Sequence, residues 1–155
     1  NIIIDSKSGY SGAGRGVHKK YANKNLYESL SAYGVGFHRH NSEIQQELDY
    51  HSKNKVNFNF TPHLTPMFRG ILSTIYIDLK PGVSIGKIHK ELKNFYKKDF
   101  YCNISICKTK YKDKIIILSA IDNLIKGGAG QAVQNLNFYY KFNSKKGLIW
   151  DIFYL

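Results

Sequence analysis

One segment organises the rest of this sequence: GFHRHNSEIQQEL, which runs from Gly36 to Leu48. Its second half predicts the start of a helix. Asn41 is a suitable N-cap, while Ile44 and Leu48, four residues apart, share one helix face. The unsatisfied N–H groups at such a helix start favour a bound anion. We also expect a short strand from Tyr33 to Phe37, which leads the chain into the helix.

The first half of the segment supplies groups for chemistry. His38 and His40 are the side chains best suited to transferring a proton near neutral pH. Arg39, between them, adds a planar and permanently charged group that can hold a carboxylate or phosphate through two hydrogen bonds. A His-x-His pair on a strand can be a hydrogen-bonded surface or interface pair, half of a metal site, or a catalytic pair. The pair by itself leaves all three interpretations open.

The composition is that of one folded domain. The chain has 155 residues, of which 43% are hydrophobic and 22% charged, so a disordered chain is excluded. No apolar run approaches the roughly 20 residues that a membrane-spanning helix needs. Asn1 to Asp5 is predicted as a strand already under way, so we expect the chain to be a fragment of a longer protein. No membrane partner is expected.

The formal net charge of +12 raises the question of a nucleic-acid partner. Lysine accounts for nearly all of it and is spread along the chain, which indicates a general compositional bias rather than a phosphate-binding groove. We therefore expect no nucleic acid. A stand-alone basic nucleic-acid-binding module is the second hypothesis, and a purely structural dimerisation module is the third.

The two cysteines, Cys102 and Cys107, lie five residues apart in a predicted strand. An odd separation directs them to opposite faces of a sheet, so a disulfide between them is not expected. Neither has a second cysteine or a histidine at metal-ligand spacing. We expect reduced thiols and a cytoplasmic protein.

The remaining pattern predicts an α+β fold with a mixed, largely antiparallel sheet covered by helices on one face. The segment from Ser6 to Gly16 is rich in glycine around Arg15, and is either an anion-binding nest of N–H groups or a flexible linker. Pro62 and Pro66 are expected to exclude regular structure around them. The predicted elements are strands at 56–60, 74–79, 101–107, 114–122 and 147–150, and helices around 26–30, from Ser84 to Phe95 and from Ala129.

These segments, in this order, resemble the catalytic and dimerisation domain of N-acetyl-gamma-glutamyl-phosphate reductases, enzymes of arginine biosynthesis in the semialdehyde dehydrogenase family. The resemblance covers the chain to about Asn137. The residues that carry it are Ser8–Arg15, His38–His40, Glu43–Ile44, Phe60–Leu64, Met67, Arg69–Gly70, Ile121–Leu124, Lys126–Gly127 and Ala129–Ala132.

The resemblance implies a single substrate-binding and dimerisation domain over residues 1–155, built like the C-terminal domain of glyceraldehyde-3-phosphate dehydrogenase. It implies that the intact protein is an NADPH-dependent oxidoreductase that reduces an acyl phosphate to a semialdehyde and forms a homodimer or homotetramer. In such enzymes the nucleotide-binding Rossmann domain and the nucleophilic cysteine belong to a segment that precedes this domain. Neither Cys102 nor Cys107 lies in the family's cysteine motif. The fragment alone is therefore expected to be inactive.

The same resemblance implies roles for individual residues, and it assigns no metal ligands. His40 is favoured as the acid/base, with His38 beside it. Gly130 and Gln131 are expected to contact the cofactor. Ser42 departs from the family, which usually has proline there, and the segment between Cys107 and Ile115 is shorter than in relatives. The residues expected to bind substrate are Ser8, Gly9, Arg15, Arg39, Glu43 and Arg69.

Overall fold

The computed structural model describes residues 1–14, 28–97 and 101–148. Its strands are β1 (Ile2–Gly9), β2 (Ser31–Ala32), β3 (Phe58–Thr65), β4 (Ile71–Asp78), β5 (Cys102–Lys108) and β6 (Lys114–Ile121). Its helices are the short 3-10 helix η1 (Tyr10–Ala13) and the α-helices α2 (Asn41–Ser52), α3 (Ile85–Phe95) and α4 (Ala129–Tyr139).

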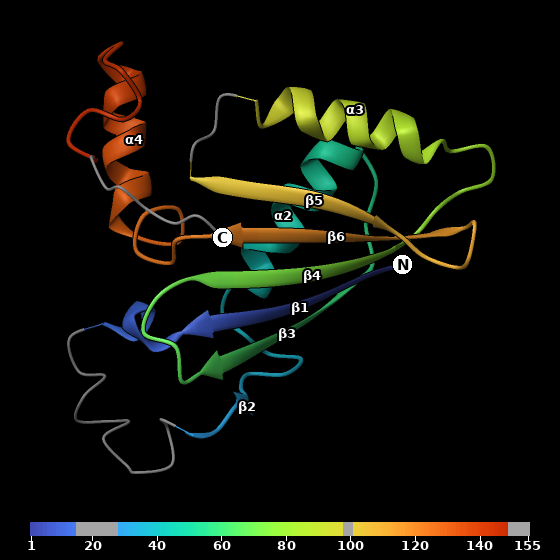
Figure 1. The fold of residues 1–155 in the computed structure, drawn as a ribbon, viewed down its shortest axis with the longest axis horizontal. Coiled ribbons are helices and arrows are strands. Elements are labelled where there is room, and N and C mark those ends of the chain that lie inside the picture. The colour runs from blue at the N-terminus through green and yellow to red at the C-terminus, as the bar shows by residue number, and fades with distance from the viewer. Residues whose placement is uncertain (15–27, 98–100, 149–155) are drawn as a thin grey trace.

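The six strands form one sheet in the order β2-β3-β1-β4-β6-β5 (Figure 1). β1 and β3 run parallel, and every other neighbouring pair is antiparallel. The predicted mixed and largely antiparallel sheet is confirmed. In Figure 1, α2 crosses behind the sheet, α3 runs alongside β5, and α4 stands beyond the end of β6.

Strand alternation gives the sheet two different faces. On the covered face, Phe60 of β3 contacts the ring of His38 just before α2, and Ile104 and Ile106 of β5 lie against α3. The opposite surface, which we call the open face, presents Ile3, Leu72 and Tyr76, which are 41%, 42% and 45% exposed. As the sequence predicted, helices cover one face of the sheet; these helices are α2 and α3.

The path of β3 corrects one expectation, because the strand continues through Pro62 to Thr65. Pro62 pairs with Ser6 of β1 on one side, and on the other side its carbonyl accepts a hydrogen bond from the N–H of Tyr33 at 3.0 Å. The nitrogen and carbonyl of one strand residue point to the same side. The missing N–H of proline therefore faces the short β2, where little pairing is lost.

The segment before α2 corrects a second expectation. The strand predicted from Tyr33 to Phe37 is absent; instead β2 ends at Ala32 and a turn follows. Gly34 and Gly36 have φ values of 58° and 81°, left-handed conformations that end a strand and that glycine adopts without strain. The N-cap of α2 is His40 rather than Asn41, and no side chain caps this helix start.

The other predicted elements agree with the structure to within a few residues. Ser84 caps α3, accepting the N–H of Lys87, and α4 begins at Ala129 as expected. Cys102 and Cys107 lie on opposite faces of β5, and no disulfide joins them. Two predictions differ: residues 28–30 of the helix predicted at 26–30 are not α-helical, and residues 147–148 of the strand predicted at 147–150 are not in a strand, while 26–27 and 149–150 lie outside the described residues.

α4 turns its polar side toward the protein. Gly130, Gln134 and Asn137 are its buried residues, whereas Phe138 and Tyr139 are 64% and 80% exposed. The Asn137 amide group donates hydrogen bonds to the carbonyls of Ser144 and Lys146 and so holds the turn that follows the helix. The apolar side of α4 is therefore left uncovered by the described residues.

Candidate active site

The two predicted catalytic histidines lie in contact, in the turn that leads into α2. The ring centroids of His38 and His40 are 4.7 Å apart. His38 also makes edge contacts with Tyr33 at 5.3 Å and with Phe60 at 5.4 Å. Phe60 belongs to β3, so the sheet anchors this cluster. His38 is half-buried between the rings, while His40 is exposed.

The backbone defines the proton position on His38. The N–H of His40 donates to Nδ1 of His38 at 3.3 Å, so Nδ1 is an acceptor and the neutral ring carries its proton on Nε2. Burial, then the charges of His40 and Arg39, hold the pKa of His38 below its usual 6.5. His38 is therefore neutral at pH 7, and the exposed ring beside it is that of His40.

Arg39 and Glu43 flank the histidines at the start of α2. Both are exposed, and Glu43 lies in the first turn of the helix, where its negative charge suits the helix dipole. The hydroxyl of Ser42 donates to the carbonyl of Arg39 at 3.2 Å, which closes the turn. The structure thus brings four of the predicted residues together: His38, Arg39, His40 and Glu43.

Ser8, Gly9 and Arg69 form a second group, at the end of β1. The N–H of Gly9 donates to the carbonyl of Gly70 at 2.8 Å, which joins the β1 end to the turn before β4. A side chain at Gly9 would lie 2.8 Å from backbone atoms of Phe68 and Arg69, so only glycine permits this approach. The N–H groups of Tyr10 and Ser11 are also bonded within this turn pair. These three N–H groups therefore do not form the open anion-binding nest that the sequence allowed.

Arg69 is drawn inward by a residue that the sequence did not single out. Its Nε lies 2.5 Å from Oδ2 of Asp122, whose side chain is 3% exposed. The other carboxylate oxygen, Oδ1, accepts the N–H groups of Leu124 and Ile125 at 2.8 and 2.9 Å. Asp122 thereby ties the turn before β4 to the turn that leads into α4. In the sequence, Asp122 stood out only as part of Ile121–Leu124, a stretch that carries the family resemblance. Nothing near it in the sequence indicates that it pairs with Arg69, 53 residues away.

The two residues expected to contact the cofactor lie at the start of α4. A side chain at Gly130 would come within 2.5 Å of Cα of Ile125, so this glycine is required for packing. The side chain of Gln131 accepts from Lys126 and donates to Asn135. The N–H groups of Gly130 and Gln131 are bonded to the carbonyls of Leu124 and Gly128. Cofactor contact by these residues stays a prediction.

The strand register separates the histidine cluster from the β1 end. Phe60, which contacts His38, pairs with Ile4 of β1, four residues before Ser8. At roughly 3.3 Å per residue, the two groups lie about 13 Å apart along the strand. Arg15 lies outside the described residues.

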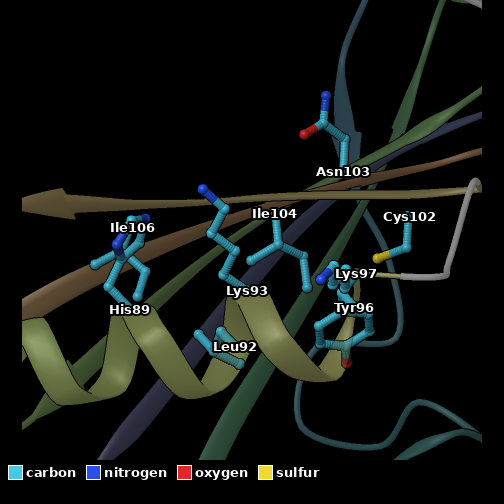
Figure 2. A pocket seen from close by; sticks show the side chains of 9 residues that line it. All are labelled: His89, Leu92, Lys93, Tyr96, Lys97, Cys102, Asn103, Ile104 and Ile106. Atoms are coloured by element: carbon cyan, nitrogen blue, oxygen red, sulfur yellow. The ribbon is translucent and has the colours of Figure 1, made fainter.

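A separate hollow of about 290 Å³ lies between α3 and β5 (Figure 2). Figure 2 shows Ile104 pointing from β5 toward the helix, Asn103 pointing away from it, and the side chains of His89, Lys93 and Lys97 around the rim. None of the predicted site residues lines this hollow. Within the described ranges, no group of three or more histidine, cysteine or acidic side chains could hold a metal ion, and no helix is long and apolar enough to cross a membrane.

Comparison with known proteins identifies the family. Residues 1–101 match the model of the semialdehyde dehydrogenase dimerisation domain. The chain belongs to this family. One relative is N-acetyl-gamma-glutamyl-phosphate reductase of Staphylococcus saprophyticus, which is 42% identical to this chain. The match covers 96% of this chain and 49% of the length of the relative. The probable chloroplastic N-acetyl-gamma-glutamyl-phosphate reductase of Arabidopsis thaliana is 41% identical over 96% of this chain and 42% of its own length.

This semialdehyde dehydrogenase dimerisation domain thus spans about half the length of the curated relatives that it matches. Solved structures agree on the fold. Aspartate semialdehyde dehydrogenase II of Vibrio cholerae superposes with a TM-score of 0.66 at 13% identity, over 90% of this chain and 54% of that protein. A probable aspartate-semialdehyde dehydrogenase of Pseudomonas aeruginosa gives 0.66 at 14% identity, over 91% and 55%. The predicted fold is confirmed.

Proposed function

We propose that this chain is the substrate-binding and dimerisation half of an NADPH-dependent reductase that converts N-acetyl-glutamyl phosphate to N-acetyl-glutamate semialdehyde. Two relatives named N-acetyl-gamma-glutamyl-phosphate reductase, one of them as probable, are 41% and 42% identical across 96% of the chain and support this reaction. The structural observation that carries the proposal is the His38–His40 pair, held against β3 at the start of α2.

In the proposed reaction His40 transfers the proton. Its ring is exposed at the helix start, and we propose that it donates the proton to the oxygen of the reacting acyl group. His38 stays neutral and accepts the backbone N–H of His40, which fixes the turn on which His40 stands. A histidine with this exposure can act as donor and acceptor in successive steps. His38 is thus the positioning partner of His40.

The negative groups of the substrate are proposed to bind on either side of this pair. Arg39 is exposed next to both histidines and can hold a phosphate or carboxylate through two parallel hydrogen bonds. At the β1 end, the hydroxyl of Ser8 lies beside the turn that carries Arg69. Arg15, which follows β1 and η1 in the chain, is proposed as a further anion contact. Glu43 is proposed to orient the substrate from the first turn of α2.

NADPH is proposed to bind mainly to a nucleotide-binding half that precedes this domain, and it would supply hydride to the acyl carbon. At the start of α4 the N–H groups of Gly130 and Gln131 are hydrogen-bonded within the chain, so they are not open to a cofactor phosphate. This segment can therefore contact only the edge of a bound cofactor. Gly130 and Gln131 are therefore proposed as flanking contacts. The exposed apolar side of α4, with Phe138 and Tyr139, is the proposed docking surface for that half.

The open face of the sheet is the proposed dimer interface. Ile3, Leu72 and Tyr76 form its apolar part, and strand pairing places them side by side on β1 and β4. A charged group accompanies them: Oδ1 of Asp5 lies 2.5 Å from Nζ of Lys7 and 3.3 Å from Nδ1 of His63. The family's description as a dimerisation domain supports this use of the face. A homodimer buries it through one two-fold axis.

The test is a joined reductase, in which the nucleotide-binding half of the Staphylococcus saprophyticus enzyme is followed by this chain. We expect it to oxidise NADPH in the presence of N-acetyl-glutamyl phosphate, whereas this chain alone should not. The matched control is the same fusion with His40→Asn, which keeps the fold but removes the proton donor.

Two results would contradict the proposal. One is a folded joined reductase that binds NADPH and yet gives no turnover, while the parent enzyme is active under the same conditions. The other is turnover by the 155-residue chain alone, which would place the nucleophile and the cofactor site within it.

A further inference from the structure

The side chain of Asn123 connects three segments beneath the candidate site. It is 3% exposed. Its Nδ2 donates to the carbonyl of Gly9 at 3.1 Å and to Oγ of Ser11 at 3.0 Å, and its Oδ1 accepts the N–H of Gly70 at 3.0 Å. One amide thus pairs with the end of β1, with η1 and with the first residue after Arg69. The residue itself begins the turn that leads into α4.

The surrounding backbone leaves little freedom for another arrangement. A side chain at Gly12 would lie 3.3 Å from Nδ2 of Asn123, and one at Gly9 would meet Phe68 and Arg69. Rings of Tyr10 and Phe68 contact each other across the two turns, with centroids 5.4 Å apart. Beside the Arg69–Asp122 ion pair, the amide of Asn123 uses its donor side on the turn after β1 and its acceptor side on the turn before β4.

We propose that Asn123 is a positioning residue: it holds the turn after β1 and the turn before β4 in one geometry, and so sets where Ser8, at the end of β1, meets the anionic end of the substrate. The inference rests on the proposed function for the identity of that substrate. Asn123 does not itself touch the substrate, because its amide is consumed by Gly9, Ser11 and Gly70.

The first test is Asn123→Asp in the joined reductase. The carboxylate keeps the shape, can still accept from Gly70 and can accept from the hydroxyl of Ser11, but it cannot donate to the carbonyl of Gly9. Losing one buried hydrogen bond of this kind corresponds to about a tenfold change in an equilibrium constant. We expect KM for the acyl phosphate to rise about tenfold while kcat stays within about twofold, since the proton-transfer residues are unchanged.

Asn137→Asp is the matched control. Asn137 is 4% exposed and likewise donates from Nδ2 to two backbone carbonyls, those of Ser144 and Lys146, in the turn after α4. It should lower the melting temperature as Asn123→Asp does, but leave KM unchanged. Equal effects of both substitutions on KM would overturn the proposal, because Asn123 would then act only through general stability.

A second measurement separates this inference from the proposed function. In the 155-residue chain, amide hydrogen exchange at Gly9, Ser11 and Gly70 should be about tenfold faster in Asn123→Asp and unchanged in Asn137→Asp. If the joined reductase has no activity, the exchange rates still judge the positioning role. If Asn123→Asp fails to fold, Ser11→Ala removes one bond only and should speed exchange at Gly9 about threefold. Unaltered exchange in the folded variant would refute the inference.

Discussion

The ion pair between Arg69 and Asp122 is the feature whose loss should have the clearest effect on stability. The perturbation is Asp122→Asn, which keeps the shape of the side chain and can still accept the N–H groups of Leu124 and Ile125. It removes the negative charge 2.5 Å from Nε of Arg69 and turns an amide donor toward that guanidinium. The arginine is then left with an unmatched charge in a largely buried place.

The magnitude follows from the burial of the two partners. Breaking one side of a buried ion pair destabilises a protein by about 3–5 kcal/mol. Arg69 is 16% exposed and Asp122 3% exposed, so the arginine recovers part of its hydration and the lower end, about 3 kcal/mol, applies. For a chain of this size, each 1 kcal/mol lowers the melting temperature by about 2–4 °C. We expect a fall of about 6–12 °C.

The assay is thermal and urea unfolding of the 155-residue chain, followed by circular dichroism. Asp78→Asn is the control, because Asp78 forms an exposed ion pair with Lys114 and should leave the midpoint unchanged. In the double variant with Arg69→Met, the unmatched charge is gone, so the combined loss should be smaller than the sum of the single losses by about 1–3 kcal/mol. A midpoint shift no larger than that of Asp78→Asn, or strict additivity, would refute the reasoning.

Four further outcomes are expected. His40→Asn should lower kcat of the joined reductase by about a hundredfold or more without unfolding it, as measured by NADPH oxidation; unaltered turnover would move the role to His38 or water. Arg39→Lys should raise KM for the acyl phosphate by about tenfold, since a point charge cannot replace the two-pronged contact, and equal KM values would make Arg39 a surface charge. The NMR titration midpoint of His38 should lie below 6.5 and rise in Arg39→Gln. In the unsubstituted chain the folded state has the lower His38 pKa, so it binds fewer protons than the unfolded state. The stability contributed by neutral His38 is therefore present above pH 6.5 and lost as the pH falls through the folded-state pKa. Sedimentation should show a dimer for the chain and a monomer for Tyr76→Lys, and two identical dimers would exclude the open face as the interface.

The sequence predicted those features that depend on near neighbours. Ser84 followed by apolar residues at helical spacing gave the start of α3 correctly, and the alternation of Phe58 and Phe60 gave a half-buried strand. Two predictions failed, one because of strand pairing and one because of backbone conformation. Pro62 was expected to end regular structure, yet it lies inside β3 because its nitrogen faces the side where β2 offers little pairing. The strand expected before α2 is broken by Gly34 and Gly36.

In the candidate site, too, groupings of residues close in sequence were predictable and contacts between distant residues were not. His38, Arg39, His40 and Glu43 are close in sequence, so their grouping could be foreseen. The hydrogen bonds of Asn123 to Gly9, Ser11 and Gly70 at the end of β1 could not be foreseen, because Asn123 lies 114 residues from Gly9 in the sequence. Arg69 shows the consequence. Its type suggested an anion site, whereas the fold supplies an internal carboxylate from Asp122.

The same strands serve the site on one face and the proposed dimer interface on the other. On β3, Phe60 supports His38 on the covered face, and the neighbouring residues, Asn59 and Thr61, point to the open face. On β1, Ile4 faces with Phe60, whereas Ile3 is directed to the open face. A shift of one residue in the pairing of β3 with β1 would exchange the two sets: Phe60 would turn away from His38, and Asn59 and Thr61 would face the covered side of the sheet. The candidate site and the proposed interface therefore depend on one register, and a dimer that buries the open face would favour the register that also places Phe60 against His38.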